Sequence, residues 1–213
     1  MKKYAMVFDA GTGAGRCNLF DMSGRLVSYA YREWEYLKDL SSSNKEAMLF
    51  DAEQFKKILF SLCRKVITQA GISADEIVAV SATSQREGMV WLDRFGKEIY
   101  AAPSVDLRGE EAADILSGKE PFIKEITGLP VSGMFGLARL LWYKKFNKAV
   151  YDRIDTVMMI SDWICYLLCG SKVSEPSVAS SSQLFDVKNG KWSSELLKSV
   201  GLRTDIFPEI SDF

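Results

Sequence analysis

The opening of the chain contains three short runs in which apolar residues recur at strand spacing. Tyr4–Phe8 is apolar, and Arg16–Asp21 and Leu26–Trp34 alternate with the period of two that is typical of β-strands. A glycine-rich segment separates the first two runs, and Ser23 with Gly24 supplies a tight turn before the third. The pattern predicts a three-stranded antiparallel meander at the start of the chain.

A helix is predicted directly after the polar, serine-rich stretch at 40–45. Asp51 is a suitable N-terminal cap, and Gln54 stands three residues later, as in a capping box. Apolar residues then recur at helical spacing, at Phe55, Ile58, Leu59, Leu62 and Val66. Gly71 lies just past the last of them and is a suitable C-terminal stop. We therefore expect a helix with one apolar face.

The rest of the chain alternates between strand and helix patterns. Ile77–Thr83 is an apolar run, as expected for a strand at the centre of a sheet covered on both faces. Further strands are predicted at Met89–Leu92, Ile99–Pro103 and Thr156–Ile160, and helices at Glu110–Leu116, Gly136–Phe146, Ser161–Gly170 and Ser193–Val200. A meander followed by such alternation predicts an α/β fold with a mixed sheet and flanking helices. No repeat or linker divides the sequence, so we expect residues 1–213 to form one unit.

Charge and composition narrow the classes of function. The chain has 27 basic and 28 acidic side chains and a net charge of −1, so it lacks the basic excess typical of proteins that bind nucleic acid or anionic membranes. Its most apolar late stretch, Val157–Leu168, is interrupted by Ser161 and Asp162 and is too short for a membrane span. We expect no nucleic-acid or membrane partner, and a cytoplasmic location.

The reactive side chains limit the chemistry. The chain has no histidine, so a general base would have to be a carboxylate, lysine, tyrosine or cysteine. The four cysteines, at 17, 63, 165 and 169, include no Cys-x-x-Cys pair and do not indicate a zinc site. Cys165 and Cys169 share a helix face and are expected to be small buried residues. Cysteines this few and this widely spaced fit a reducing compartment.

The turn Asp9–Arg16, with glycines at 11, 13 and 15, is the first candidate site. Glycines allow a tight turn and bring backbone N–H groups against an anion, although a hairpin can also need them for geometry alone. A dinucleotide fingerprint would require a helix directly after the glycines. The residues after Arg16 alternate like a strand instead, so the dinucleotide interpretation fails.

The polar residues of this turn favour phosphate. Gly11 and Gly13 would present backbone donors, and Thr12 adds a hydroxyl. Arg16 adds a forked cation suited to phosphate oxygens. Asp9 would face the same ions, where a carboxylate is useful when magnesium stands between it and the phosphates. These five residues form the predicted phosphate and magnesium site, with Asp9 binding the metal through water.

A second candidate site follows the apolar run at 77–83. Gln85, Arg86 and Glu87 come at the end of the predicted strand, where ligands bind in α/β folds. Arg86 and Glu87 would offer a donor and an acceptor to adjacent hydroxyl groups. A surface ion pair would use the same two residues, so the residues alone leave the two interpretations about even.

These segments resemble the N-terminal domain of FGGY-type carbohydrate kinases. The family's opening Asp-x-Gly-Thr-x-Ser-x-Arg is matched over Asp9–Arg16, except that Ala14 stands in place of the serine. The segment Gln85-Arg86-Glu87 is similar to the family's substrate-contacting segment. Asp106, in Val105–Arg108, is similar to the aspartate of the family's Asp-x-Arg segment. The resemblance implies that Asp106 accepts a substrate hydroxyl and that Arg108 orients Asp106 or caps a helix.

Later segments extend the resemblance over essentially the whole chain. Thr127–Leu129 with Arg139–Trp142 is similar to the family's Thr-Gly and Lys-Leu-Leu-Trp segments, where we expect Leu140, Leu141 and Trp142 to be core residues. Asp162, in Met159–Trp163, is expected to be an acid at a helix N-terminus, where the helix dipole favours it. Among subfamilies, the motifs look most like autoinducer-2 kinases and next most like xylulokinases.

The resemblance implies an actin-like, ribonuclease H-like fold and an ATP-dependent enzyme. Its reaction would transfer a phosphoryl group to a primary hydroxyl of a small sugar or polyol, xylulose-like or autoinducer-2-like, with ATP and magnesium as cofactors. The family has two lobes, and its general base and adenosine pocket belong to the second. No segment here matches them, so we expect no catalytic base in this chain and no activity without the second lobe.

Two further possibilities follow. A lobe without its partner could form a homodimer. A non-catalytic binding or assembly module on the actin fold is the alternative function, which the loss of the family serine at Ala14 favours. The chain keeps both the predicted phosphate site, at Asp9–Arg16, and the predicted substrate site, at 85–87 with Asp106. A non-catalytic module would need neither, so their presence argues against this alternative. An acetate-kinase-like or hexokinase-like enzyme would share the first loop only.

Overall fold

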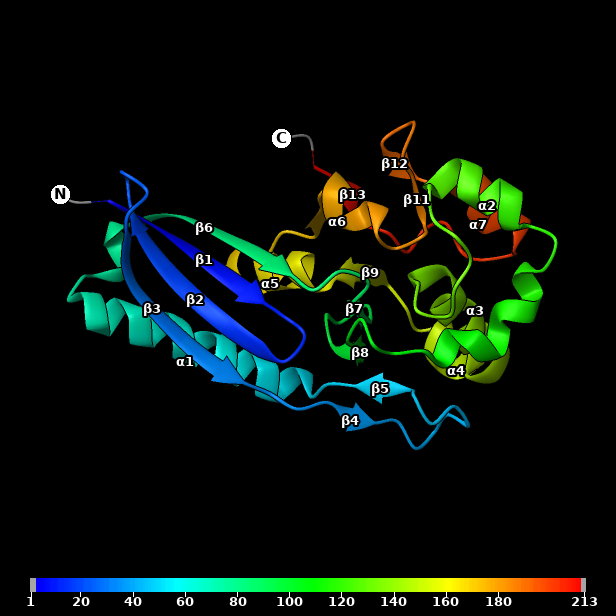
Figure 1. Ribbon diagram of the computed structural model, residues 1–213, viewed down its shortest axis with the longest axis horizontal. Coiled ribbons are helices and arrows are strands. Elements are labelled where there is room, and N and C mark those ends of the chain that lie inside the picture. Colours follow the sequence, from blue (N-terminus) through cyan, green and yellow to red (C-terminus); the bar gives the residue numbers. More distant parts are fainter. Residues whose placement is uncertain (1–2, 212–213) are drawn as a thin grey trace.

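The computed structural model describes residues 3–211, and its first sheet confirms the predicted meander (Figure 1). The sheet has the order β3-β2-β1-β6, in which β1, β2 and β3 are antiparallel neighbours and β6 lies parallel to β1. Its strands span Tyr4–Ala10 (β1), Ala14–Asp21 (β2), Leu26–Glu33 (β3) and Ile77–Ser84 (β6). This is the mixed sheet expected of an α/β protein.

Helix α1, Ala52–Ala70, packs on β2 and β3 and has the predicted ends. The Asp51 carboxylate accepts a hydrogen bond from the backbone N–H of Gln54 at 3.0 Å, which satisfies one of the free donors of the first turn. Gly71 ends the helix in the left-handed region, with φ of 64°, where a side chain would be strained. The apolar face predicted from the spacing is buried against the sheet.

Strand β6 differs from its prediction. The apolar run at 77–83 was expected at the centre of a sheet, but β6 is an edge strand whose only sheet partner among residues 3–211 is β1. Val78 and Val80 are about half exposed, at 50% and 47%. Helix α5 packs against β6, but one helix cannot cover both faces and the open edge. The run therefore has the composition of a buried strand without the neighbours that would bury it.

A second sheet, with the order β8-β7-β9, is antiparallel throughout. Its strands, Met89–Leu92 (β7), Glu98–Ala102 (β8) and Thr156–Met159 (β9), match the predicted positions within two residues. Every residue of the central strand β7 is buried. Helix α5 begins at Ile160, directly after β9 and one residue before its predicted start at Ser161, and Met159 occupies its N-cap position.

Most of the remaining elements lie around the second sheet, but the 3₁₀ segment at 74–76 connects α1 to β6 of the first sheet (Figure 1). The helices are α2 (Glu120–Thr127), α3 (Gly136–Phe146), α4 (Lys148–Tyr151), α5 (Ile160–Cys169), α6 (Pro176–Ser180) and α7 (Ser194–Ser199). Short strand pairs are β4 (Leu37–Lys38) with β5 (Met48–Leu49), β10 (Val173–Ser174) with β13 (Glu209–Ile210), and β11 (Phe185–Asp186) with β12 (Lys191–Trp192). The segments Ala74–Glu76 and Arg108–Leu116 are 3₁₀ helices, the second of which includes the helix predicted at Glu110–Leu116.

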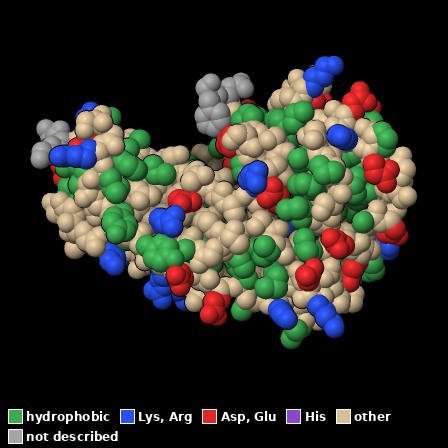
Figure 2. Space-filling model, in the orientation of Figure 1, with side chains coloured by type: hydrophobic (Ala, Val, Ile, Leu, Met, Phe, Trp, Pro, Cys, Tyr) green, Lys and Arg blue, Asp and Glu red, His purple; other side chains and the backbone are tan. Residues whose placement is uncertain are grey.

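Two apolar cores hold the structure together. One lies between the first sheet, α1 and α5, and the other gathers around β7, α3 and α7. Leu140, Leu141 and Trp142 belong to the second core, as predicted. Figure 2 shows basic and acidic side chains interspersed over the visible face. Across the described part of the chain, no helix combines the length and the apolar character that crossing a bilayer requires.

Asp162 lies in the first turn of α5, as predicted, and is buried there. Its carboxylate accepts a hydrogen bond from the Ser174 hydroxyl at 2.6 Å and a longer one from the Met159 N–H at 3.4 Å. Burial raises the pKa of Asp162 to about 7, because desolvation of the charged form outweighs these two hydrogen bonds.

This pKa predicts a pH-dependent effect of Asp162→Asn. Between pH 4 and 7 folded Asp162 keeps a proton that the unfolded chain releases, so the free energy of unfolding falls as the pH rises through this window. Asparagine cannot ionise, so the melting temperature of the variant, relative to that of the original protein, should rise between pH 5 and pH 8. Asp114→Asn, at an exposed carboxylate, is the control. A difference between variant and original that does not change with pH would contradict the assignment.

Candidate functional site

The glycine-rich turn joins β1 to β2 as a short hairpin loop. The two strands pair Asp9 with Arg16, and the Gly11 N–H donates to the Ala14 carbonyl at 2.9 Å. Arg16 Nη1 lies 3.5 Å from Asp9 Oδ2, and both side chains are partly exposed. The Trp34 indole N–H donates to the Thr12 carbonyl at 3.2 Å and anchors the loop from the side of β3. The loop thus presents a carboxylate and a guanidinium side by side.

The glycines of this loop serve two different purposes. A Cβ at Gly13 would meet nothing within 4 Å, which leaves its backbone open to a close approach. A Cβ at Gly15 would come within 2.5 Å of the Trp34 ring, so that glycine is required for packing. The loop borders an open hollow of about 420 Å³, lined by Gly11, Thr12, Gly13, Ala14, Arg16, Tyr31 and Glu33.

Gln85 ties this loop to the end of β6. Because β1 and β6 are parallel, their carboxyl ends meet, and the Gln85 N–H donates to the Ala10 carbonyl at 2.8 Å. The Gln85 side-chain Nε2 donates to the Tyr36 hydroxyl at 2.8 Å and to the Gly11 carbonyl at 3.4 Å. Its Oε1 accepts from the N–H and the hydroxyl of Ser104, both at 2.8 Å.

Both N–H donors of the Gln85 side-chain amide and both lone pairs of its oxygen are thus used within the protein. Gln85 was predicted to bind substrate, but this geometry gives it a different task. It fixes the glycine-rich loop and the loop that contains Ser104 relative to each other.

Arg86 and Glu87 follow Gln85 and differ in exposure. The Arg86 side chain is 81% exposed, whereas that of Glu87 is 13% exposed, and Arg86 Nε lies 3.9 Å from Glu87 Oε1. Glu87 has φ of 61°, in the left-handed region that non-glycine residues rarely occupy. Burial raises the pKa of Glu87, while Arg86 and Arg139 partly oppose this. Such backbone strain is concentrated at functional sites in proteins.

Arg139 holds the backbone around Glu87 and was not recognised as a site residue from the sequence. It is fully buried on α3, and its guanidinium donates to three carbonyls: Glu87 at 2.9 Å, Ser104 at 3.0 Å and Asp106 at 3.1 Å. The Ser181 hydroxyl accepts from the Glu87 N–H at 3.3 Å. The only sequence signal was an arginine in a segment otherwise predicted as core, where the family has lysine.

The surroundings of Asp106 differ from those expected of a substrate-binding residue. It was expected to accept a substrate hydroxyl, but its side chain is fully buried. Its Oδ2 accepts from Arg108 Nε at 2.7 Å and from the Tyr100 hydroxyl at 2.6 Å, and its Oδ1 accepts from the Met48 N–H at 3.1 Å. Arg108 therefore orients Asp106, as one of its two predicted roles requires. The Asp106 carboxylate thus has no exposed surface and three close donors, which is the environment of a buried structural ion pair.

Comparison with known proteins decides the family. The family model of the N-terminal domain of the FGGY family of carbohydrate kinases matches residues 4–212. The chain belongs to this family. The resemblance seen in the sequence motifs is thereby confirmed, and so is the predicted fold.

A curated relative agrees with the family in sequence, and two solved structures share the fold. The chain is 34% identical over 215 residues to an autoinducer-2 kinase of Salmonella paratyphi B, covering 98% of this chain and 40% of that relative. The gluconate kinase of Lactobacillus acidophilus superposes with a TM-score of 0.84 at 21% identity, over 100% of this chain and 42% of that one. A xylulose kinase of the same organism superposes with a TM-score of 0.83 at 21% identity, over 99% of this chain and 42% of that one. The chain thus spans about 40% of the length of the curated relatives it matches.

The donors of the glycine-rich loop fit the phosphates of a nucleotide and a magnesium ion. Asp9 supplies one partly exposed carboxylate, and Arg16, the Thr12 hydroxyl and the open backbone at Gly13 supply donors. Within residues 3–211, no three acidic, cysteine or histidine side chains gather into a ligand set. Magnesium is commonly bound by one or two carboxylates together with substrate phosphates and water, so this set of donors suits it.

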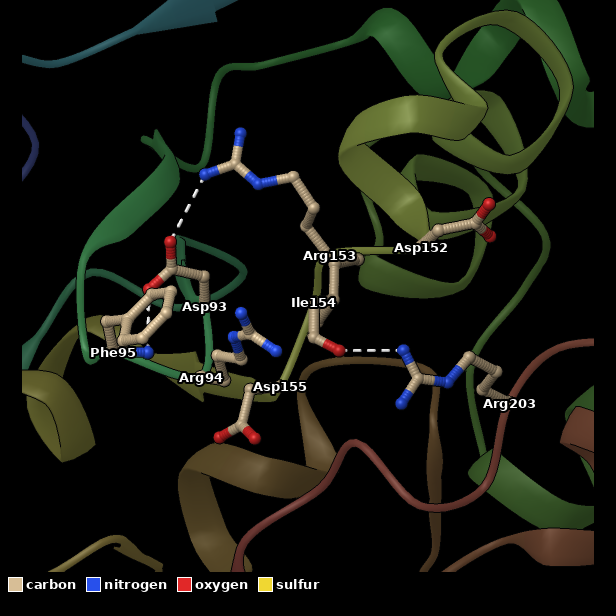
Figure 3. A pocket seen from close by; sticks show the side chains of 8 residues that line it. All are labelled: Asp93, Arg94, Phe95, Asp152, Arg153, Ile154, Asp155 and Arg203. Carbon is tan, nitrogen blue, oxygen red and sulfur yellow. Dashed lines mark hydrogen bonds and ion pairs between the residues drawn. The ribbon is translucent and has the colours of Figure 1, made fainter.

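A separate hollow of about 520 Å³ lies between the turn after β7 and the loop before β9 (Figure 3). Three arginines and three aspartates contribute to its lining. Arg153 Nη2 contacts Asp93 Oδ2 at 3.1 Å, and Arg203 Nη1 donates to the Ile154 carbonyl at 2.7 Å. Arg153 and Asp93 thus pair with each other, whereas Asp152, Asp155 and Arg203 pair with residues outside the lining, namely Lys148, Lys172 and Asp205. None of the predicted site residues lines this hollow.

Proposed function

We propose that this chain is the phosphate- and sugar-facing lobe of an ATP-dependent carbohydrate kinase. Its reaction transfers a phosphoryl group to a primary hydroxyl of a small sugar or polyol of the xylulose or autoinducer-2 class. On this proposal residues 1–213 supply one of two lobes, and the general base belongs to the other.

One observation carries the proposal. The parallel strands β1 and β6 end side by side, and the Gln85 side chain after β6 donates to the Gly11 carbonyl of the loop after β1 and accepts from Ser104, which follows β8. The loop that we propose for phosphate and the two charged residues that we propose for sugar hydroxyls therefore lie at the same edge of one sheet. Ligands of α/β proteins bind at this edge, outside the carboxyl ends of the strands.

The residues of the chain have distinct tasks in this scheme. ATP with magnesium would supply the phosphoryl group and the divalent charge that neutralises it. Asp9 would bind the magnesium ion through water, and Gly11, Thr12, Gly13 and Arg16 would bind phosphate oxygens. Arg86 would donate to the sugar and Glu87 would accept from it. The strained backbone of Glu87 and its mostly buried carboxylate favour this role over that of a surface ion pair.

The similarity to autoinducer-2 kinases favours a linear dihydroxy-diketone as substrate over a ketopentose. The test is an assay of ADP release with ATP and Mg²⁺, using autoinducer-2, xylulose, gluconate and glycerol in turn, by a protein in which this chain is joined to the second lobe that the proposal requires. We expect ADP release above background with one sugar or polyol, most with autoinducer-2. ATP turnover that no member of the panel raises, together with no sugar binding by calorimetry, would contradict the proposal.

Arg86→Ala is expected to weaken sugar binding selectively. A hydrogen bond from a charged donor contributes about 1.5–3 kcal/mol, so sugar affinity should fall roughly 10- to 100-fold. Nucleotide affinity should change little, because Arg86 is assigned to the sugar. Calorimetric titration with each ligand measures both effects. Arg94→Ala, which removes another exposed arginine that stacks on Phe95, is the control. Equal losses for both ligands would count against placing Arg86 at the sugar.

A further inference from the structure

Two cysteines that are distant in sequence lie together beneath the first sheet. Cys17 is on β2 and Cys63 is on α1, and their sulfur atoms are 3.9 Å apart. Both are free thiols. Helix α1 packs directly on β2, so the contact belongs to the core between the two elements and not to a loose surface.

The two thiols are not equivalent. Cys17 is fully buried, whereas Cys63 is only partly buried and is therefore the one that a small oxidant can reach. The Cys17 thiol donates a hydrogen bond to the Cys63 sulfur. That bond lowers the pKa of Cys63, and the charge of the neighbouring Arg64 adds to the effect, while burial opposes it. The same contact raises the pKa of Cys17 well above its ordinary value. Since the thiolate is the nucleophile, Cys63 attacks and Cys17 follows.

We propose that Cys17 and Cys63 form a peroxide-sensitive dithiol that closes to a disulfide between β2 and α1. In the first step the Cys63 thiolate attacks one oxygen of a hydroperoxide, which forms an S–O bond as the O–O bond breaks. The sulfur is oxidised to a sulfenic acid, the peroxide is reduced, and the departing oxygen takes up a proton.

In the second step the Cys17 sulfur loses its proton and attacks the Cys63 sulfur. The S–S bond forms, the S–O bond breaks, and the departing hydroxide takes up the Cys17 proton as water. With hydrogen peroxide the sum is two thiols and one peroxide giving one disulfide and two waters. A disulfide bond is about 2.05 Å long, so the sulfurs must approach by roughly 1.9 Å.

The position of the pair indicates what closure would affect. Cys17 directly follows Arg16, and its strand pairs with β1 through the register Phe8 with Cys17 and Asp9 with Arg16. A bond from Cys17 to α1 would draw the start of β2 towards the helix, beneath the glycine-rich loop. The chemistry at the two sulfurs does not depend on the proposed kinase function.

The other two cysteines provide an internal comparison. Cys165 and Cys169 lie one turn apart on α5, where Cys169 is exposed and not buried as the sequence had predicted. Burial raises the pKa of Cys165. Exposure alone would therefore direct an oxidant to Cys169, whereas the paired geometry directs it to Cys63.

The test treats the reduced protein with stoichiometric hydrogen peroxide, blocks the remaining thiols with N-ethylmaleimide, and identifies the modified peptides by mass spectrometry. We expect two of the four thiols to be lost together, a cross-linked peptide pair containing Cys17 and Cys63, and recovery with a phosphine reductant. Cys169→Ser should leave this result unchanged.

Two variants test the order of the steps. In Cys17→Ala the sulfenic acid on Cys63 should persist and be trapped by dimedone, and in Cys63→Ala the Cys17 thiol should stay reduced. A circular dichroism spectrum like that of the unsubstituted protein verifies that each variant is folded. If a variant is unfolded, the peroxide experiment on the unsubstituted protein alone tests the proposal. Oxidation of Cys169 while the Cys17 and Cys63 thiols remain free, or a Cys17 adduct formed without Cys63, would overturn the proposal.

Discussion

Asp106→Ala should destabilise the lobe by about 3–5 kcal/mol, because it removes one partner of a buried ion pair. Arg108 is fully buried and donates to Asp106 at 2.7 Å, so the substitution removes one of the two carboxylates that pair with this buried guanidinium. Asp39, 2.7 Å from Arg108 Nη1, supplies the remaining negative charge but does not replace the lost hydrogen bonds. Chemical denaturation followed by circular dichroism measures the loss.

Two outcomes distinguish the supporting role of Asp106 from a ligand-binding role. Asp114→Ala removes an exposed carboxylate that pairs with Lys145 at 3.3 Å, and it should change the free energy of unfolding by less than about 1 kcal/mol. If Asp106→Ala were as stable as this control and lost only sugar affinity, Asp106 would be a ligand and the structural interpretation would be wrong.

Glu87→Gly should lower activity and leave stability equal or higher. Replacing a non-glycine residue at φ of 61° by glycine relieves strain of roughly 1–2 kcal/mol, partly offset by the greater freedom of glycine in the unfolded chain. The substitution also removes a carboxylate whose pKa is raised by burial. On the proposed function it removes the acceptor for a sugar hydroxyl, so kcat/KM should fall roughly 10- to 100-fold.

Glu87→Gln is the matched control, because it keeps the backbone strain and a hydrogen-bond acceptor. It should keep the melting temperature of the original protein more closely and lose less activity than Glu87→Gly. A glycine variant that melts well below the original protein would show that the Glu87 side chain stabilises the fold. In that case the strain at this position would need another explanation.

Much of the fold could be predicted because its elements are specified locally. Asp51 and Gly71 mark both ends of α1. The alternation on either side of Ser23 and Gly24 predicts the antiparallel pairing of β2 with β3. These signals depend on residues close in sequence, where propensity and capping act. Strand β6 was predicted as a strand but not as an edge, because edge position depends on which neighbours are present and not on the strand's own composition.

The location of the candidate site could be predicted from the sequence, but the contacts of its individual residues could not. Residues 9–16 and 85–87 do lie together, since parallel strand ends meet at one edge of the sheet. The sequence could not separate Arg86, which is exposed, from Asp106, which is buried, because both follow strands and both are charged. Arg139 was missed for the opposite reason. Its neighbours in sequence are core residues, and its three carbonyl partners lie 33 to 52 residues away.

The four hydrogen bonds of the Gln85 side-chain amide have a thermodynamic consequence. One amide contacts the Gly11 carbonyl with its nitrogen and Ser104 with its oxygen, so neither loop can shift without altering the bonds of the other. A ligand that moves the Gly11 carbonyl therefore changes the free energy of the Ser104 side. Linkage requires the effect to be reciprocal, so on the proposed function nucleotide and sugar would change each other's affinity by the same factor. Gln85→Leu should bring that factor towards one, even where neither affinity alone is lost.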